Sequence, residues 1–232
     1  MGLFDKFLKR PARRDRIARE TIDLSPPGVE GNVTYHDIDF VDCDFIMSDR
    51  WPQFLMDCNF QSCRFTLEKS LRGFGTRNAT FVNCDFLFKR ASNWRAVYGE
   101  RFESCRFKGR LKGSKFGDPR ISNDRLSGDR PGYISECDFT ELNLDEVQFY
   151  GLDTSTNCKF PGWPLIGYTT PEKRTPIPAA IQALPQAFHD KCCTVVSSPD
   201  AVYLVNVGKL DLDRAQIELL ARTTKHILIF GE

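Results

Sequence analysis

Large apolar residues recur five positions apart along the middle of the chain, and the pair recurs with a longer, nearly constant period. One series runs through Phe45, Phe65, Phe86 and Phe107, and a second precedes each member by five positions: Phe40, Phe60, Phe81 and Phe102. A spacing of five fits neither the 3.6-residue period of a helix nor the two-residue period of a strand. Self-similarity at a fixed period of this length predicts a stacked solenoid, in which each turn of chain covers its neighbour.

A cysteine comes two positions before many of these phenylalanines. The word Cys-x-Phe begins at seven places: Cys43, Cys58, Cys63, Cys84, Cys105, Cys137 and Cys158. We expect a coil with four sides of five residues, each side directing one large and one small residue inward, since free cysteine behaves as a compact buried hydrophobe. Glu100 occupies the small position before Phe102, and we expect it to turn outward at a local bulge.

Four of these words carry aspartate or asparagine between the cysteine and the phenylalanine. They are Cys43-Asp44-Phe45, Cys58-Asn59-Phe60, Cys84-Asp85-Phe86 and Cys137-Asp138-Phe139. The chain resembles the pentapeptide-repeat family, whose consensus reads Ala/Cys-Asp/Asn-Leu/Phe-x-x. The resemblance covers residues 33–163 and implies a mainly β fold, a right-handed quadrilateral β-helix. Some family members resemble duplex DNA in size and negative charge, bind type II topoisomerases and confer quinolone resistance, which gives one alternative function.

The two ends of the chain lack the repeat. Residues 1–24 are predicted to form a basic amphipathic helix, which either caps the first coil or lies on a membrane surface. Residues 164–185 are rich in proline and indicate a linker. Residues 186–232 predict a small α/β unit, with strands at 193–196, 202–207 and 226–230 and a helix over 213–223 capped by Asp211. Such a unit is too small to be robust alone, so we expect it to pack on the solenoid or to form a homodimer.

Charge is segregated along the chain although the net charge is only +1. From Lys89 to Arg130 there are twelve basic and five acidic residues, a net charge of +7. Residues 110–131 interrupt the period, and we expect a projecting basic loop that docks on a macromolecule; the alternative is a solvated loop at a coil corner. The expected partner contacts are Lys112, Lys115, Arg120, Arg125 and Arg130, with Trp94 as an aromatic anchor beside them.

The sequence offers no persuasive catalytic, cofactor or metal site. His189-Asp190 and Cys192-Cys193 place a base, a carboxylate and thiols close in sequence, but a nucleophile needs its base held in space. The three histidines are scattered and the cysteines form no Cys-x-x-Cys pair, so we expect no metal. Seven of the nine cysteines share the repeated position, which favours reduced thiols and a cytoplasmic protein.

These patterns predict a non-enzymatic binding or scaffold protein that presents a rigid β-helix face and a basic loop. A protein partner is favoured, while nucleic acid at the loop and a membrane at the N-terminal helix are alternatives. A further alternative makes the solenoid a docking arm for an effector or enzymatic unit at the C-terminus.

Overall fold

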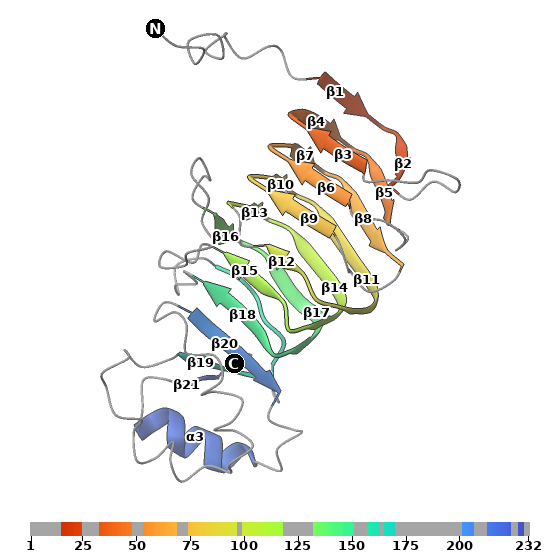
Figure 1. The fold of residues 1–232 in the computed structure, drawn as a ribbon. Coiled ribbons are helices and arrows are strands. Elements are labelled where there is room, and N and C mark those ends of the chain that lie inside the picture. The colour runs from red at the N-terminus through yellow and green to blue at the C-terminus, as the bar shows by residue number, and fades with distance from the viewer. Residues whose placement is uncertain are drawn as a thin grey trace, which may run out of the picture.

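The computed structural model describes eleven stretches of the chain (Figure 1). They are residues 15–24, 33–47, 53–68, 74–96, 99–117, 132–150, 157–162, 165–169, 201–206, 213–223 and 227–229. The fold is mainly β, and its strands follow one another in steps from β1 at one end to β18 near the other (Figure 1). The predicted parallel β-solenoid is confirmed.

Two six-stranded parallel sheets run along the solenoid. Sheet A consists of β1 (Asp15–Ala18), β4 (Ile38–Val41), β7 (Asn59–Gln61), β10 (Thr80–Val82), β13 (Arg101–Glu103) and β16 (Tyr133–Ser135). Sheet B consists of β2 (Thr21–Asp23), β5 (Asp44–Met47), β8 (Arg64–Leu67), β11 (Asp85–Ser92), β14 (Arg106–Lys112) and β17 (Asp138–Asp145). Each strand of sheet A is followed by the sheet B strand of the same coil, so consecutive sheet partners lie one repeat apart in sequence.

A third side of the coil is formed by sheets C and D. Sheet C contains β3 (Val33–His36), β6 (Gln53–Met56) and β9 (Phe74–Arg77). Sheet D begins with β12 (Arg95–Ala96), β15 (Lys115–Gly117) and β18 (Val147–Tyr150). The short strand β12 lies beside β9, so the two sheets continue each other along the solenoid.

The phenylalanine series forms the core. In sheet B, Phe45, Phe65, Phe86, Phe107, Phe139 and Phe160 stack with centroids 4.6–5.2 Å apart and planes within 16° of parallel. The sheet A series stacks in the same way beside it, at 4.8–5.1 Å. Burying each ring contributes about 1.5–3 kcal/mol, and the two series meet edge to face. Phenylalanines five positions apart therefore point into the core from two neighbouring sheets, as the sequence predicted.

The cysteines form a buried column beside the sheet B phenylalanines. Register places six of the seven Cys-x-Phe cysteines in this column, while Cys58 lies at the neighbouring corner with Ala79. Each of these thiols is free, and Cys84, for example, donates a hydrogen bond to the carbonyl of Val82 at 3.4 Å. Hydrogen bonds with the thiols of Cys105 and Cys63, together with burial, raise the pKa of Cys84. The free, mostly buried thiols of the column serve as packing groups.

The first coil begins earlier than the sequence indicated. Residues 15–24 belong to strands β1 and β2, so the predicted helix over 1–24 is wrong for this part; residues 1–14 lie outside the described residues. Ile17 aligns with Phe40 and Ile22 with Phe45, which continues both inward series. The step from Ile17 to Phe40 is longer than the step from Phe40 to Phe60, and this irregularity hid the coil in the sequence.

Glu100 points into the solenoid, and the predicted outward bulge is wrong. Its side chain is fully buried, and its Oε1 accepts a hydrogen bond from Thr76 Oγ1 at 2.7 Å. Thr76 is itself an inward residue of β9, aligned with Leu55 of β6. A polar donor inside the coil therefore lets a carboxyl group occupy a position that holds Cys58 and Ala79 on the two preceding coils.

The C-terminal part closes the far end of the solenoid. Strand β20 (Ala201–Asn206) pairs antiparallel with β18 and extends sheet D through β19 (Leu165–Thr169) and β21 (Ile227–Ile229). The predicted strands near 202–207 and 226–230 are confirmed, whereas residues 165–169 form a strand where a linker was expected. Because the switch to antiparallel pairing covers the last parallel strand with this chain's own backbone, this part acts as an intramolecular cap.

Helix α3 (Arg214–Thr223) accompanies this cap, as the sequence predicted. Its N-cap is Asp213, whose Oδ1 accepts the backbone N–H of Gln216 at 2.7 Å, while the Gln216 side chain accepts the backbone N–H of Asp213. The expected cap, Asp211, lies outside the described residues. Ile217 is fully buried, which anchors the helix by its apolar face.

Candidate binding surfaces

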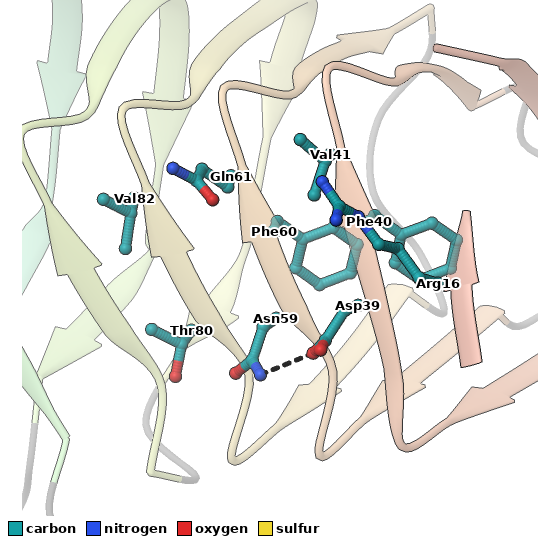
Figure 2. A pocket seen from close by; sticks show the side chains of 9 residues that line it. All are labelled: Arg16, Asp39, Phe40, Val41, Asn59, Phe60, Gln61, Thr80 and Val82. Atoms are coloured by element: carbon teal, nitrogen blue, oxygen red, sulfur yellow. Dashed lines mark hydrogen bonds between the residues drawn. The ribbon is translucent and has the colours of Figure 1, made fainter. Parts of the chain in front are cut away.

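The outer face of sheet A carries a groove of about 520 Å³ (Figure 2). Asp39, Asn59 and Thr80 line one edge, and Val41, Gln61 and Val82 line the other (Figure 2). The Asn59 side chain donates a hydrogen bond to Asp39 Oδ1 at 2.7 Å. Because the Asn59 amide already binds the Asp39 carboxylate, this groove is a polar surface on which that charge is partly satisfied.

The outer face of sheet B carries a charge column, which we define as Asp44, Arg64, Asp85, Arg106, Asp138 and Lys159. The sign alternates at every step. Arg64 lies 3.4 Å from Asp44, and Arg106 lies 2.8 Å from Asp85. Each of these residues precedes an inward phenylalanine, so the repeat period brings opposite charges together on neighbouring coils.

Other charges beside this column are paired in the same way. Lys89 Nζ lies 2.6 Å from Glu68 Oε1, and Lys108 Nζ lies 2.5 Å from Glu141 Oε2. A groove of about 290 Å³ is lined by the paired residues Asp85, Arg106, Lys108 and Glu141, among others. Around the charge column, sheet B therefore presents neither a strongly acidic nor a strongly basic surface.

A second surface lies on the two coils that contain Asp85 and Arg106. We define the basic face as Arg90, Arg95, Arg110, Lys112 and Lys115, which come from the ends of β11 and β14 and from β12 and β15. The first four side chains are exposed, and none of these four forms an ion pair with any residue that the structure describes. Lys115 is half-buried and aligns in register with Arg95. Like charges thus lie side by side on adjacent coils.

A bulge in β11 brings two of these arginines together. Phe88 aligns with Gly109 and Ser92 with Leu111, so residues 89–91 lie opposite Arg110 alone. Gly109 has φ +114°, and a Cβ there would overlap the backbone carbonyl of Phe88. The glycine lets the strands approach closely where the chain bends, and the extra residues of β11 carry Arg90 outward beside Arg110.

The insertion is shorter than the expected 110–131. Residues 110–117 complete a regular coil in β14 and β15, with Leu111 and Phe116 fully buried. Gly117, at φ +97°, ends β15 where a Cβ would overlap the carbonyl of Tyr150. Strand β15 ends at Gly117 and β16 begins at Tyr133, and residues 118–131 between them lie outside the described residues.

With this boundary, the basic excess belongs to the coils and not to the expected loop. Residues 89–117 contain nine basic and two acidic residues, a net charge of +7, whereas 118–131 contain three arginines and three aspartates, a net charge of zero. Lys112 and Lys115 are thus on the solenoid itself. Arg120, Arg125 and Arg130 belong to the charge-balanced segment that the structure leaves undescribed.

Trp94 is a core residue, which corrects the expectation that it anchors a partner. Its side chain is 1% exposed and packs against Phe86, Phe102 and Phe116 with ring centroids 5.4–5.6 Å apart. Its backbone N–H donates to Ser114 Oγ at 2.9 Å. The polar neighbours Asn93 and Arg95 disguised this inward position in the sequence.

Sequence reasoning missed Arg90 and Arg95 as surface residues of the same face. For Arg95 the signal was present, because Lys115 follows it by one repeat period, the same step that separates Phe45 from Phe65. For Arg90 it was absent, because the bulge in β11 changes the local spacing.

No catalytic arrangement emerges from the part of the chain that the structure describes. His189, Asp190, Cys192 and Cys193 all lie outside it. His36 Nε2 lies 3.3 Å from Asp57 Oδ2 at an exposed corner. Across the described ranges, no three His, Cys, Asp or Glu side chains gather as metal ligands, and no helix has the length and apolarity needed to cross a membrane.

In comparisons with known proteins, no family model and no curated protein matches this chain.

Proposed function

We propose that this protein is a non-enzymatic binding protein that uses its solenoid as a rigid support for the basic face. The observation that carries the proposal is the contrast in charge pairing. Around the charge column four cations have carboxylate partners within 3.4 Å, whereas Arg90, Arg95, Arg110 and Lys112 have none among the described residues. Adjacent like charges cost stability, so four exposed cations gathered on two neighbouring coils without carboxylate partners favour an external acidic partner.

The support is suited to recognition. The basic face stands over buried residues of the phenylalanine core, including Trp94, Leu111 and Phe116. Backbone bonds between successive coils fix the relative positions of the cations, so little conformational entropy is lost when a partner docks.

We also propose that the solenoid is of the pentapeptide-repeat type, a right-handed quadrilateral β-helix. The Cys-Asp-Phe and Cys-Asn-Phe words support it, because their cysteine and phenylalanine point inward and their central polar residue points outward. An experimental structure with four-sided coils of right-handed sense would establish the assignment.

Binding to a topoisomerase as a DNA mimic draws no support from the surfaces above. Such mimicry needs a strongly acidic face, and the charge column alternates in sign at every step. The outward residues of sheet A are also mixed, with Arg16, Asp39, Asn59, Thr80 and Arg101 in one row. We therefore base the proposal on the basic face.

The test uses two variants matched in residue type and charge. The basic-face variant is R95Q/R110Q/K112Q, and the charge-column variant is R64Q/R106Q/K159Q. Each removes two arginines and one lysine, so each net charge changes from +1 to −2. In an affinity capture from bacterial lysate, an acidic partner should be retained by the intact protein and the charge-column variant and lost by the basic-face variant. Equal retention by all three would refute the proposal.

A further inference from the structure

The basic face differs from a protein-docking surface in its lack of apolar side chains. The exposed large hydrophobic residues among those described are Ile46, Tyr133 and Leu219, and none of them belongs to the two coils that form the basic face. Protein interfaces draw most of their binding energy from buried aromatic or aliphatic anchors. The one aromatic residue expected to serve as such an anchor, Trp94, is inside the core.

What the basic face does offer is a set of hydrogen-bond donors. Arg95 and Arg110 supply planar guanidinium groups, and Lys112 supplies an ammonium group. Exposed amide side chains at Asn93 and Asn143 flank them, and Asn143 is the register neighbour of Arg110. Arginine, lysine and asparagine are the side chains that contact phosphate oxygens in nucleic-acid complexes.

The spacing of the cations also suits a chain of phosphates. Arg95 and Lys115 lie on adjacent strands, roughly 4.8 Å apart as in any β-sheet. Phosphates of one DNA strand advance about 3.4 Å each along the helix axis, so cations on neighbouring coils can contact successive or alternate phosphates. A single carboxylate on a folded protein would leave most of these donors without a partner.

From these observations we propose that the partner of the basic face is duplex nucleic acid, contacted through its phosphate backbone without sequence preference. This inference rests on the proposed function and names the class of its acidic partner. Duplex is preferred to single strands because no exposed aromatic ring, on which unpaired bases would stack, lies among the described residues of these two coils. The charge-balanced segment 118–131 is not needed for the inference.

The experiment is fluorescence anisotropy with the full chain and a labelled 20-base-pair DNA duplex, measured over a range of salt concentrations. The intact protein should bind with an affinity that falls as salt rises, by about 0.9 in log K per log salt for each phosphate contact. The basic-face variant should bind at least about tenfold more weakly, and its salt slope should be smaller in magnitude by roughly 2 to 3. The charge-column variant, equal in net charge, should keep the slope of the intact protein. Circular dichroism melting of each variant checks that it is folded.

Four further outcomes test this inference, and the last two also bear on the proposed function. Loss of duplex binding to the same extent in the charge-column variant would overturn the inference, because overall charge would then explain the binding. Tighter binding of a 20-nucleotide oligo-dT than of the duplex would also overturn it. Binding of poly-glutamate but not duplex would overturn the inference and leave the proposed function standing, whereas binding of neither polyanion would count against both.

Discussion

The charge column on sheet B and the basic face share the coils of Asp85 and Arg106, yet they differ in how charge is arranged. In the column the repeat brings Asp44, Arg64, Asp85 and Arg106 into alternation, and each cation lies against a carboxylate. In the basic face the repeat places Arg95 beside Lys115, and a bulge brings Arg90 beside Arg110. A solenoid stacks residues one period apart, so the order of signs along the sequence decides whether a surface neutralises itself or stays charged. Self-neutralised surfaces serve the fold, and charged ones are available to a partner.

The largest expected effects come from the core beneath the two surfaces. Trp94 lies under the basic face and Phe86 under the charge column, with 1% and 2% of their side chains exposed. Trp94→Ala and Phe86→Ala should each lower the free energy of unfolding by about 3–5 kcal/mol, measured by urea denaturation. Trp94→Phe should cost less and should retain duplex binding. If Trp94→Ala abolished binding at unchanged stability, Trp94 would be a partner contact after all.

A smaller effect is expected at the point where the chain leaves the basic coil. Gly117→Ala places a Cβ against the carbonyl of Tyr150 at φ +97°, and we expect a loss of about 2–3 kcal/mol in unfolding free energy. Gly113→Ala is the matched control, since φ is +67° there and the nearest atom belongs to the flexible side chain of Asn93. Its loss should be only about 1 kcal/mol. Equal losses would show that backbone conformation alone matters at Gly117.

The matched variants should separate stability from binding. The charge-column variant loses the partners of Asp44, Asp85 and Asp138, and at about 0.2–1 kcal/mol for each exposed pair we expect a total loss of roughly 1–2 kcal/mol. The basic-face variant removes cations without carboxylate partners, so its stability should stay within about 0.5 kcal/mol of the intact protein. Urea denaturation of both variants measures this difference. Greater destabilisation of the basic-face variant would mean that its cations serve the fold.

Much of this architecture could be predicted from the sequence, because large side chains must leave water and their spacing reveals the coil. The inward phenylalanines and the cysteine column follow from that spacing alone. The orientation of Glu100 could not be predicted, since its hydrogen-bond donor, Thr76, comes from the preceding coil and has no place in the apolar pattern. Strand β19 was hidden for a related reason, because a long stretch of sequence separates Thr169 at its end from Ala201 at the start of its partner β20.

The candidate site was predicted in part. Lys112 and Lys115 were predicted as partner contacts, which stays a prediction, but they were assigned to a projecting loop because the insertion boundary was placed before Leu111 and Phe116 rather than after them. Arg90 was not identified as a residue of the basic face, because a bulge is a local change in register that leaves no periodic signal. The position of a surface residue can therefore be predicted only when every inward residue that precedes it in the sequence has been assigned correctly.

The smallest expected effect concerns the end of the charge column. Hydrogen bonds from the Thr140 hydroxyl at 2.6 Å and from its backbone N–H lower the pKa of Asp138. The charges of Lys159 and Arg106 lower this pKa further, whereas partial burial opposes the shift. An aspartate whose pKa is lowered by folding stabilises the protein above its unfolded pKa. This contribution is lost as pH falls through the folded value.

Asp138→Asn should therefore reduce the unfolding free energy at pH 7 by well under about 1 kcal/mol, because solvent screens this partly exposed carboxylate. Below about pH 4, where an unfolded aspartate takes up its proton, the difference from the intact protein should shrink towards zero. Urea denaturation between pH 2 and pH 7 measures this difference, and Thr140→Val in each background shows whether it depends on the hydroxyl donor. The basic-face variant removes no carboxylate and leaves the column intact, so its stability should follow the pH profile of the intact protein. A matching loss of pH dependence in that variant would mean that the two surfaces are electrostatically coupled, and the division between a self-neutralised column and an independent basic face would then be wrong.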